Sequence, residues 1–199
     1  MGNMKITNQY KAHRTSGASG FTLIEVMVVV AIIAVLATMT VGGLSWYKRK
    51  AAIGKTEVLV NGLSRALEEY RLDNGFFPQG DGGTGSSEQV YIALYGDGEL
   101  VSDGSGNVTI GTAPTGASDP GNTVYLAILN PDLQGSKLNV ESSAGSYSII
   151  DSWGLEINYR SPGVMNPADD FDLWSLGPDG RGGANTGTQK ERADDTKNW

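Results

Sequence analysis

Residues 21–44 read FTLIEVMVVVAIIAVLATMTVGGL, a run whose single ionisable side chain is Glu25. At about 1.5 Å per residue, a helix of that length crosses the roughly 30 Å hydrocarbon core of a lipid bilayer. A secretory signal has a shorter apolar part, of about 7–15 residues, and its small residues follow that part. Here the small residues SGASG, at 16–20, come before the run. We therefore predict a retained membrane-spanning helix over residues 21–44, preceded by a leader of residues 1–20 that is removed.

Glu25 lies inside this apolar run, where a carboxylate costs about 2.5–3.5 kcal/mol on insertion scales and therefore needs a partner. Cleavage after Gly20 would make the new amine of Phe21 the nearest cation. A second use of Glu25 is local, because Thr22-x-x-Glu25 fits the capping box at a helix start. The two roles are compatible, and the pairing role is favoured because a cap needs no glycine in front of it.

Gly20, Phe21 and Glu25, directly in front of an apolar helix, resemble the N-terminus of the type IV pilin and pseudopilin family. The resemblance implies that a prepilin peptidase cuts after Gly20 and methylates the amine of Phe21. It also implies that Glu25 pairs with the Phe21 amine of an adjacent subunit in a helical homopolymer. Charge leaves the topology open, because Lys48-Arg49-Lys50 follow the span while three Lys/Arg precede it. The resemblance places the leader in the cytoplasm and the head in the periplasm, on a single-pass anchor in the bacterial inner membrane.

Composition and charge narrow the function classes. The 199 residues carry a net charge of −7, and residues 75–199 hold 17 Asp/Glu against 6 Lys/Arg, a balance of −11. An acidic head argues against nucleic acid or an anionic membrane surface as its partner. No cysteine is present, and the one histidine, His13, lies in the leader. Neither an H-E-x-x-H motif nor a G-x-x-x-x-G-K-[ST] loop occurs, so we expect no enzymatic activity.

Beyond the apolar run, the periodicity becomes amphipathic over residues 45–75. Apolar residues at spacings of three and four gather on one helical face. The members of that face are Leu59, Leu63, Ala66, Leu67 and Tyr70. Asn74-Gly75 ends the helix, because this pair favours left-handed backbone, and Pro78 prevents its return. We predict one helix of about 78 Å over residues 22–73, and the sequence leaves open a bend at Gly42-Gly43.

Residues 76–199 are predicted to form one periplasmic head, giving an α+β fold. A short helix at 86–95, with Ser87 as its cap, is followed by an irregular glycine-rich loop at 96–122. Periodicity does not settle the type of the apolar run at 124–129. Short strands are predicted to form a small antiparallel sheet on the outer half of the long helix, at residues 147–150, 157–159 and 171–174. Trp153 and Trp174 are expected to be core residues that fill the contact between the long helix and this sheet.

Three C-terminal segments resemble the major pseudopilins of type II secretion: DSWG at 151–154, DLWSLGPDG at 172–180 and DDTKNW at 194–199. Those proteins carry proline at the position of Ser152. The resemblance implies a structural subunit of a short periplasmic fibre that helps to drive folded proteins through the outer membrane. The implied partners are other copies, the prepilin peptidase, the minor pseudopilins and the inner-membrane secretion platform.

Two alternatives remain open at this point. One is a type IV pilin or minor pseudopilin that works in adhesion, DNA uptake or fibre initiation. The other is a membrane-anchored periplasmic binding or enzyme domain whose N-terminus matches by chance. Glu25 argues against the second, because a mere anchor has no use for a carboxylate. Asp179 with Asp194-Asp195 favours the major pseudopilin over the first alternative, because many pilins use a C-terminal disulfide instead.

Segment 175–199 offers the one candidate metal site. Aspartates in glycine-rich backbone supply hard oxygen ligands, a combination that favours Ca²⁺ over Mg²⁺ or zinc. The resemblance implies three carboxylates and three backbone carbonyls as calcium ligands: Asp179, Asp194 and Asp195, with Leu176, Arg181 and Arg192. The alternative is an acidic, frayed tail that binds no metal.

Overall fold

The computed structural model describes residues 20–105, 107–133, 139–182, 188–189 and 195–199, without the side chains of residues 40–43. It contains two compact units, Met1–Leu44 and Ser45–Trp199. Helix α1 (Leu23–Asn74) has 52 residues and contributes to both units. Its backbone stays helical through Gly42-Gly43.

The first half of α1 is apolar on every side. From Phe21 to Met39 the large apolar side chains are 53–87% exposed. Among the described residues, α1 is the one helix that is long and apolar enough to cross a membrane. Exposing this much apolar surface to water is unfavourable, so this unit requires lipid or other helices around it.

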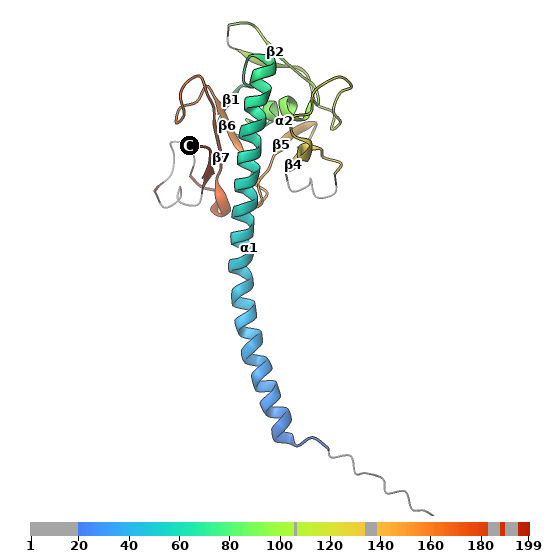
Figure 1. Ribbon diagram of the computed structural model, residues 1–199, viewed down its shortest axis with the longest axis vertical. Helices are drawn as coiled ribbons and strands as arrows, with labels where there is room; N and C mark the ends of the chain where they lie inside the picture. Colours follow the sequence, from blue (N-terminus) through green and yellow to red (C-terminus); the bar gives the residue numbers. More distant parts are fainter. Residues whose placement is uncertain (1–19, 106, 134–138, 183–187, 190–194) are drawn as a thin grey trace, which may run out of the picture. The chain divides into compact units, whose positions relative to one another are not determined.

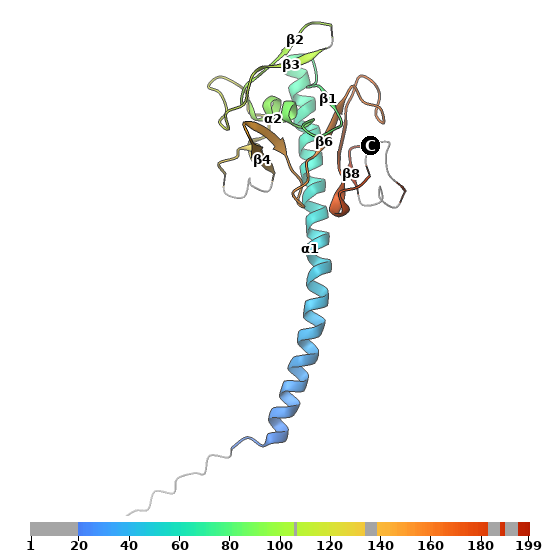
Figure 2. The same ribbon diagram turned by 180° about the vertical axis from the view of Figure 1, so that it is seen from behind.

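The outer half of α1 buries one face in the second unit. The predicted apolar face is confirmed, because all five of its members are buried: Leu59, Leu63, Ala66, Leu67 and Tyr70. The strands and helix α2 (Glu88–Tyr95) lie behind the outer half of α1 in Figure 1 and in front of it in Figure 2, which views the chain from the opposite side. Val58 lies outside that contact and is 73% exposed.

Helix α1 ends where the sequence predicts. Gly75 adopts a φ of 82°, in the left-handed region that glycine occupies without strain. Its N–H donates to the carbonyl of Arg71 at 2.7 Å, which satisfies one of the last carbonyls of the helix. The Arg71 guanidinium lies 4.7 Å from the centre of the Phe77 ring. The chain therefore folds back onto the helix directly after its end.

A side chain from a distant segment binds the residues directly in front of helix α2. Ser87 is its N-cap residue, as predicted, but the Ser87 hydroxyl makes no capping bond. That hydroxyl donates to Glu156 Oε1 at 2.8 Å and accepts the N–H of Ile149 at 3.0 Å. The Glu156 carboxylate also accepts the N–H of Gly85 at 3.0 and 2.9 Å. A negative charge at this end of α2 also suits the helix dipole.

A four-stranded antiparallel sheet has the order β1-β6-β7-β8. Its strands are β1 (Gly80–Asp81), β6 (Asn158–Ser161), β7 (Asp172–Ser175) and β8 (Thr196–Lys197). All four residues of β7 are buried, and this strand lies between β6 and β8 in the sheet. The core joins residues of this sheet to α1 and α2. The predicted α+β class is confirmed.

Two separate antiparallel hairpins complete the head: β2 (Glu99–Ser102) with β3 (Val108–Thr112), and β4 (Val140–Ser143) with β5 (Ser146–Ile149). The first hairpin lies within residues 96–122, so the predicted irregular loop is wrong there. Val108 is 3% exposed and anchors β3. Asp103 closes the turn by accepting the N–H of Ser105 at 2.7 Å. The strands were missed because each is only four or five residues long and the turn between them is rich in glycine and serine.

Of the remaining predictions for the head, some agree with the structure and others do not. The run at 124–129 contains the 3₁₀ helix η1 (Ala127–Leu129). The strands predicted at 157–159 and 171–174 correspond to β6 and β7, whereas the strand at 147–150 is β5, which pairs with β4 outside the sheet. Trp174 is 3% exposed, as predicted for a core residue. Trp153 is only half-buried, so its predicted place in the core is wrong, because it lies on the corner of a surface turn.

Candidate assembly and metal sites

The N-terminal candidates meet at the start of α1. The N–H and the hydroxyl of Thr22 donate to Glu25 Oε2 at 2.7 and 2.8 Å, and the N–H of Glu25 donates back to Thr22 Oγ1 at 3.3 Å. This is the reciprocal capping box. Gly20 and Phe21 precede the helix, and Phe21 is 87% exposed. Pairing of Glu25 with the Phe21 amine of a neighbour concerns two chains and stays a prediction.

The C-terminal candidates flank one end of the β7–β8 pair. Ser175 pairs with Thr196 as the last residue pair of the two strands, so Leu176 follows β7 directly and Asp195 directly precedes β8. Leu176 leads into the 3₁₀ helix η3 (Gly177–Asp179). Leu176 and Asp195 therefore leave the same end of the strand pair, although they lie far apart in the sequence.

The donors at this end of the sheet are of the kind that Ca²⁺ prefers. Asp195 Oδ1 is shielded from solvent. Asp179 is exposed, and its Oδ1 accepts the N–H of Arg181 at 2.9 Å. Arg192 and Asp194 lie outside the described residues. Within the described part of the chain, no group of three or more His, Cys, Asp or Glu side chains could hold a metal ion. Aspartate carboxylates are ligands that Ca²⁺ prefers, but two of them do not complete a calcium site, which needs further oxygen ligands.

Two residues that the sequence did not single out hold the tail in place. Asn198 Oδ1 accepts the N–H of Leu173 at 2.9 Å, and the N–H of Asn198 donates to the Leu173 carbonyl at 3.1 Å. Asn198 Nδ2 donates to the carbonyl of Phe171 at 3.1 Å. Trp199 packs edge-on against Trp174, with ring centres 5.9 Å apart. No local pattern marks Asn198, because its partners lie 25 and 27 residues away.

The turn at 151–154 ties the sheet to α1. Asp151 is 1% exposed and accepts two N–H bonds within its own turn at 2.8 and 2.9 Å. Its second oxygen accepts the hydroxyl of Ser175 at 2.6 Å. Ser152 donates its N–H to Thr56 Oγ1 of α1 at 3.3 Å. A proline at this position has no N–H, so this link requires a residue other than proline.

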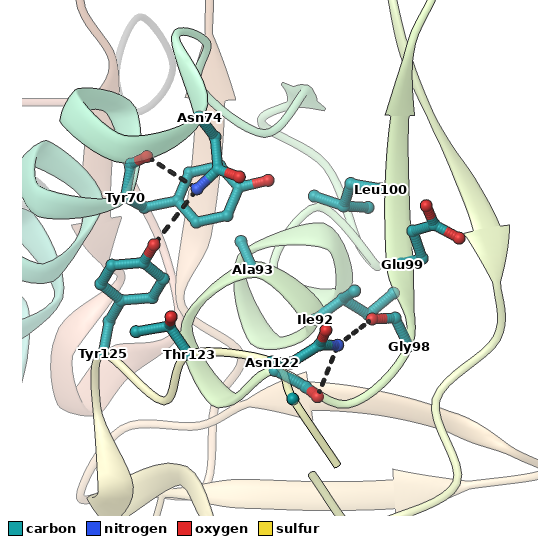
Figure 3. A pocket seen from close by; sticks show the side chains of 12 residues that line it. Tyr70, Asn74, Ile92, Ala93, Gly98, Glu99, Leu100, Asn122, Thr123 and Tyr125 are labelled. Atoms are coloured by element: carbon teal, nitrogen blue, oxygen red, sulfur yellow. Dashed lines mark hydrogen bonds between the residues drawn. The ribbon is translucent and has the colours of Figure 1, made fainter. Parts of the chain in front are cut away.

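A polar pocket of about 330 Å³ lies at the outer end of α1. Figure 3 shows Asn74 between the Tyr70 carbonyl and the Tyr125 hydroxyl, to which its Nδ2 donates at 3.0 and 3.2 Å. Across the pocket, Asn122 donates to two backbone carbonyls of the loop after α2, both at 3.1 Å. Among the residues that line the pocket, Glu99 is the one carboxylate and no His, Lys or Arg is present. The lining joins loops to the helix and offers no acid–base pair.

The tyrosines of this pocket are neutral at physiological pH. Burial raises the pKa of Tyr70 to about 12, with a smaller contribution from Tyr125. Tyr125 donates its hydroxyl to Asp73 Oδ2 at 3.0 Å. Burial first, and this bond second, raise the pKa of Tyr125 as well. Both phenols therefore act as packing and hydrogen-bonding groups.

Comparison with known proteins supplies the family. The family model described as Prokaryotic N-terminal methylation motif matches residues 15–41, and the model described as Type II secretion system (T2SS), protein G matches residues 125–198. The chain is 32% identical over 165 residues to the type II secretion system core protein G of Pseudomonas aeruginosa, covering 83% of this chain and 87% of that protein. It is 30% identical over 182 residues to that of Vibrio cholerae, covering 91% of each.

One solved structure was also compared. The crystal structure of the major pseudopilin from the type 2 secretion system of enterohaemorrhagic Escherichia coli aligns with a TM-score of 0.41 and 22% identity, covering 78% of this chain and 93% of that chain. The two matched family regions contain both candidate sites, namely the start of α1 and the β7–β8 end of the sheet. With 32% identity over 83% of its length to a curated relative, the chain belongs to the type II secretion system core protein G family.

Proposed function

We propose that this protein is the structural subunit, a major pseudopilin, of a periplasmic fibre in type II secretion. The observation that carries the proposal is the apolar half of α1, whose large side chains are 53–87% exposed. Lipid covers such a surface while the subunit is anchored in the inner membrane. In a fibre, the same helices of other copies cover it by close packing.

Glu25 gives that bundle of helices its register. The interior of an apolar bundle has a low dielectric, where an unpaired carboxylate is strongly penalised and a paired one fixes alignment. The proposed partner is the amine of Phe21 in an adjacent subunit, freed when the leader is removed after Gly20. Both Thr22 bonds go to Oε2, so Oε1 is the oxygen proposed to meet the amine.

The proposal also names partners. The prepilin peptidase would cut after Gly20 and methylate Phe21, and the minor pseudopilins and the inner-membrane secretion platform would start and extend the fibre. No catalytic activity is assigned to the chain.

Two substitutions separate pairing from capping. Glu25→Gln keeps an acceptor oxygen for Thr22 and removes the charge, whereas Thr22→Ala keeps the charge and removes the hydroxyl arm of the cap. We expect Glu25→Gln to insert into the membrane and to lose fibre assembly and protein export by at least about tenfold, since one charge of a buried pair is gone. Thr22→Ala should retain both. Immunoblots of sheared fibres and of exported proteins measure the two outcomes.

Glu68→Gln, at an exposed position of the outer half of α1, controls for the loss of one carboxylate. Normal fibres from Glu25→Gln would show that the pairing role is wrong. Equal losses in Glu25→Gln and Thr22→Ala would assign Glu25 to capping alone.

We further propose that the β7–β8 end of the sheet binds Ca²⁺. The support is the pairing of Ser175 with Thr196, which makes Leu176 and Asp195 leave the same end of the strand pair, with Asp179 three residues after Leu176 on η3. Asp194 and the backbone carbonyls of Arg181 and Arg192 would complete the set. The ion would supply the positive charge that lets these carboxylates lie close together. The bonds of Asn198 and the packing of Trp199 hold the C-terminal tail on the sheet.

Calcium should therefore stabilise the folded head. Binding to the folded state alone raises stability by about 2.7 kcal/mol when calcium is at 100 times its dissociation constant. We expect the melting temperature of the detergent-solubilised chain to be higher in calcium than in chelator. Asp194→Ala with Asp195→Ala should abolish the difference.

The matched control is Asp132→Ala with Glu141→Ala, which removes two exposed carboxylates elsewhere in the head. This control should keep the calcium shift. An unchanged melting temperature in the native chain, or a shift that survives in the Asp194/Asp195 variant, would remove calcium from this site.

A further inference from the structure

Residues 46–50 read WYKRK and form what we call the juxtamembrane collar: Trp46, Tyr47, Lys48, Arg49 and Lys50. All five side chains are exposed, with Trp46 at 67% and Tyr47 at 65%. They follow the apolar run by one residue and belong to α1. Neither helix packing in the head nor the proposed Glu25 pairing accounts for them.

The collar surrounds the helix. Successive residues of an α-helix are about 100° apart, so five of them pass through more than a full turn and cover about 7.5 Å of the axis. That length matches the polar layer on one side of a bilayer, about 5–8 Å thick. A neighbouring protein touches one side of a helix, whereas a planar layer of headgroups touches every side. The arrangement therefore favours a membrane surface as the partner.

The residue types fit the same layer. Tryptophan and tyrosine concentrate at membrane interfaces, where an apolar ring and a polar edge both find a suitable environment. The Lys50 ammonium lies 5.2 Å from the centre of the Trp46 ring. This contact holds the charge beside the ring, so that a headgroup phosphate can meet both at the same depth.

The sequence places no acidic residue next to the collar. Between Glu25 and Glu57 the sequence contains four basic residues and no Asp or Glu. The first fully buried residue of the outer helix is Thr56. It lies six residues beyond Lys50, about 9 Å along the axis. The collar therefore precedes the fully buried part of the helix, and all five of its side chains are exposed.

The position of this charge opposes the usual orientation signal. Basic residues next to a span favour the cytoplasmic side, and the leader supplies three of them there. Lys48, Arg49, Lys50 and Lys55 lie on the side of the head. Four bases that oppose the orientation of the chain call for a compensating anion on that side.

We propose that the juxtamembrane collar binds the phosphate headgroups of anionic phospholipids in the leaflet on the side of the head. Each basic residue near an anionic surface strengthens association about fivefold, so three of them give an enrichment on the order of 100-fold. A subunit leaving the membrane must release these lipids. The collar therefore retains unassembled subunits in the membrane. This inference needs the membrane span and does not depend on fibre formation.

The test uses the full chain in phosphatidylcholine vesicles with a trace of dansyl-labelled phosphatidylglycerol or dansyl-labelled phosphatidylcholine. Energy transfer from Trp46 reports the lipid in its own leaflet, and Trp46→Phe gives the background from the other tryptophans. We expect at least about tenfold enrichment of the phosphatidylglycerol probe over the phosphatidylcholine probe. The enrichment should vanish in 1 M salt, where the screening length is about 3 Å.

Lys48→Gln with Arg49→Gln and Lys50→Gln should remove the enrichment. Arg65→Gln with Lys137→Gln and Lys190→Gln removes three bases outside the collar and should keep it. Equal transfer to both probes in the native chain, or enrichment that survives in the collar variant, would overturn the proposal. Equal transfer together with crosslinks from the collar to the head of a second copy would assign the collar to a protein partner instead.

Discussion

At the scale of single residues, buried carboxylates in the head accept N–H groups of loops. Asp97 has no exposed surface and accepts the N–H groups of Thr115 and Gly116 at 2.7 and 2.6 Å. Asp172, equally buried, accepts three successive N–H groups of the loop after β6 at 2.7–2.9 Å. Bonds of this kind compensate a carboxylate for its loss of water without any cation. Part of the acidic composition therefore serves to shape loops.

Glu156 is the carboxylate whose removal tests this use. It accepts the N–H of Gly85 and the hydroxyl of Ser87 at the start of α2. Glu156→Ala leaves these donors without their partner in a partly buried place, so we expect a loss of about 1–3 kcal/mol in the free energy of unfolding. Denaturant unfolding of the solubilised chain measures the change.

Glu141→Ala is the control, because Glu141 is an exposed carboxylate on β4. It should change the free energy of unfolding by less than about 0.5 kcal/mol. Equal effects of the two substitutions would mean that Glu156 does not stabilise α2.

At the scale of elements, the β2–β3 hairpin is attached to the head by few side chains. Val108 is buried and Leu100 packs against the core, while Val101 and Ile110 are 46% and 38% exposed. Neither strand of this hairpin belongs to the four-stranded sheet. Its place therefore depends on apolar contacts from one face and not on a shared hydrogen-bond ladder.

Val108→Ala should consequently loosen the hairpin. The substitution removes two buried carbon groups, each worth about 0.8 kcal/mol, and leaves a small cavity, so we expect about 2 kcal/mol of destabilisation. Thr109→Ala, at the exposed neighbouring position of β3, is the matched control and should have little effect. Faster amide exchange in β2 and β3 of the Val108 variant, with β6 and β7 unchanged, would locate the effect. Uniform acceleration across the head would contradict a locally attached hairpin.

At the scale of the whole molecule, the two units require different surroundings. The first exposes its apolar side chains and needs lipid or other helices, whereas the second encloses a core. That core contains tyrosines with raised pKa values. Tyr70 has a pKa of about 12, and burial also raises the pKa values of Tyr91 and Tyr159. These groups make the head sensitive to alkaline pH.

The direction of this sensitivity follows from linkage. Tyr70 ionises near pH 10 when the chain is unfolded and near pH 12 when it is folded. Its neutral form is therefore fully stabilising below about pH 10, and that stability is lost as pH rises towards 12. Tyr70→Phe keeps the edge-on contacts with Phe76 and Tyr125, at 5.8 and 5.6 Å, and removes the ionising hydroxyl.

We expect the native chain and Tyr70→Phe to have similar denaturant midpoints at pH 8. Between pH 10 and 12 the midpoint of the native chain should fall further than that of the variant. Parallel curves for the two proteins over this range would show that Tyr70 does not contribute to the alkaline loss.

Signals that repeat or end locally along the chain could be interpreted from the sequence. Apolar run length identified the span, Thr22-x-x-Glu25 identified a capping box, and Asn74-Gly75 identified the end of α1. Each depends on hydropathy or on backbone preferences of residues within about four positions of one another. The amphipathic face of the outer helix was predictable for the same reason, because its period repeats locally.

Tertiary structure alone decided which distant groups meet. Glu156 binds Gly85, 71 residues before it and in front of α2, and Asn198 fixes the tail to β7 from 25 residues away. Ser175 lies opposite Thr196 only because β8 pairs with β7. No local preference encodes such contacts, since they arise once the apolar face of α1, α2 and the sheet close on a common core. The sequence by itself determined the anchor, its lone carboxylate and the family, whereas packing determined where the carboxylates of the head lie and what they hold.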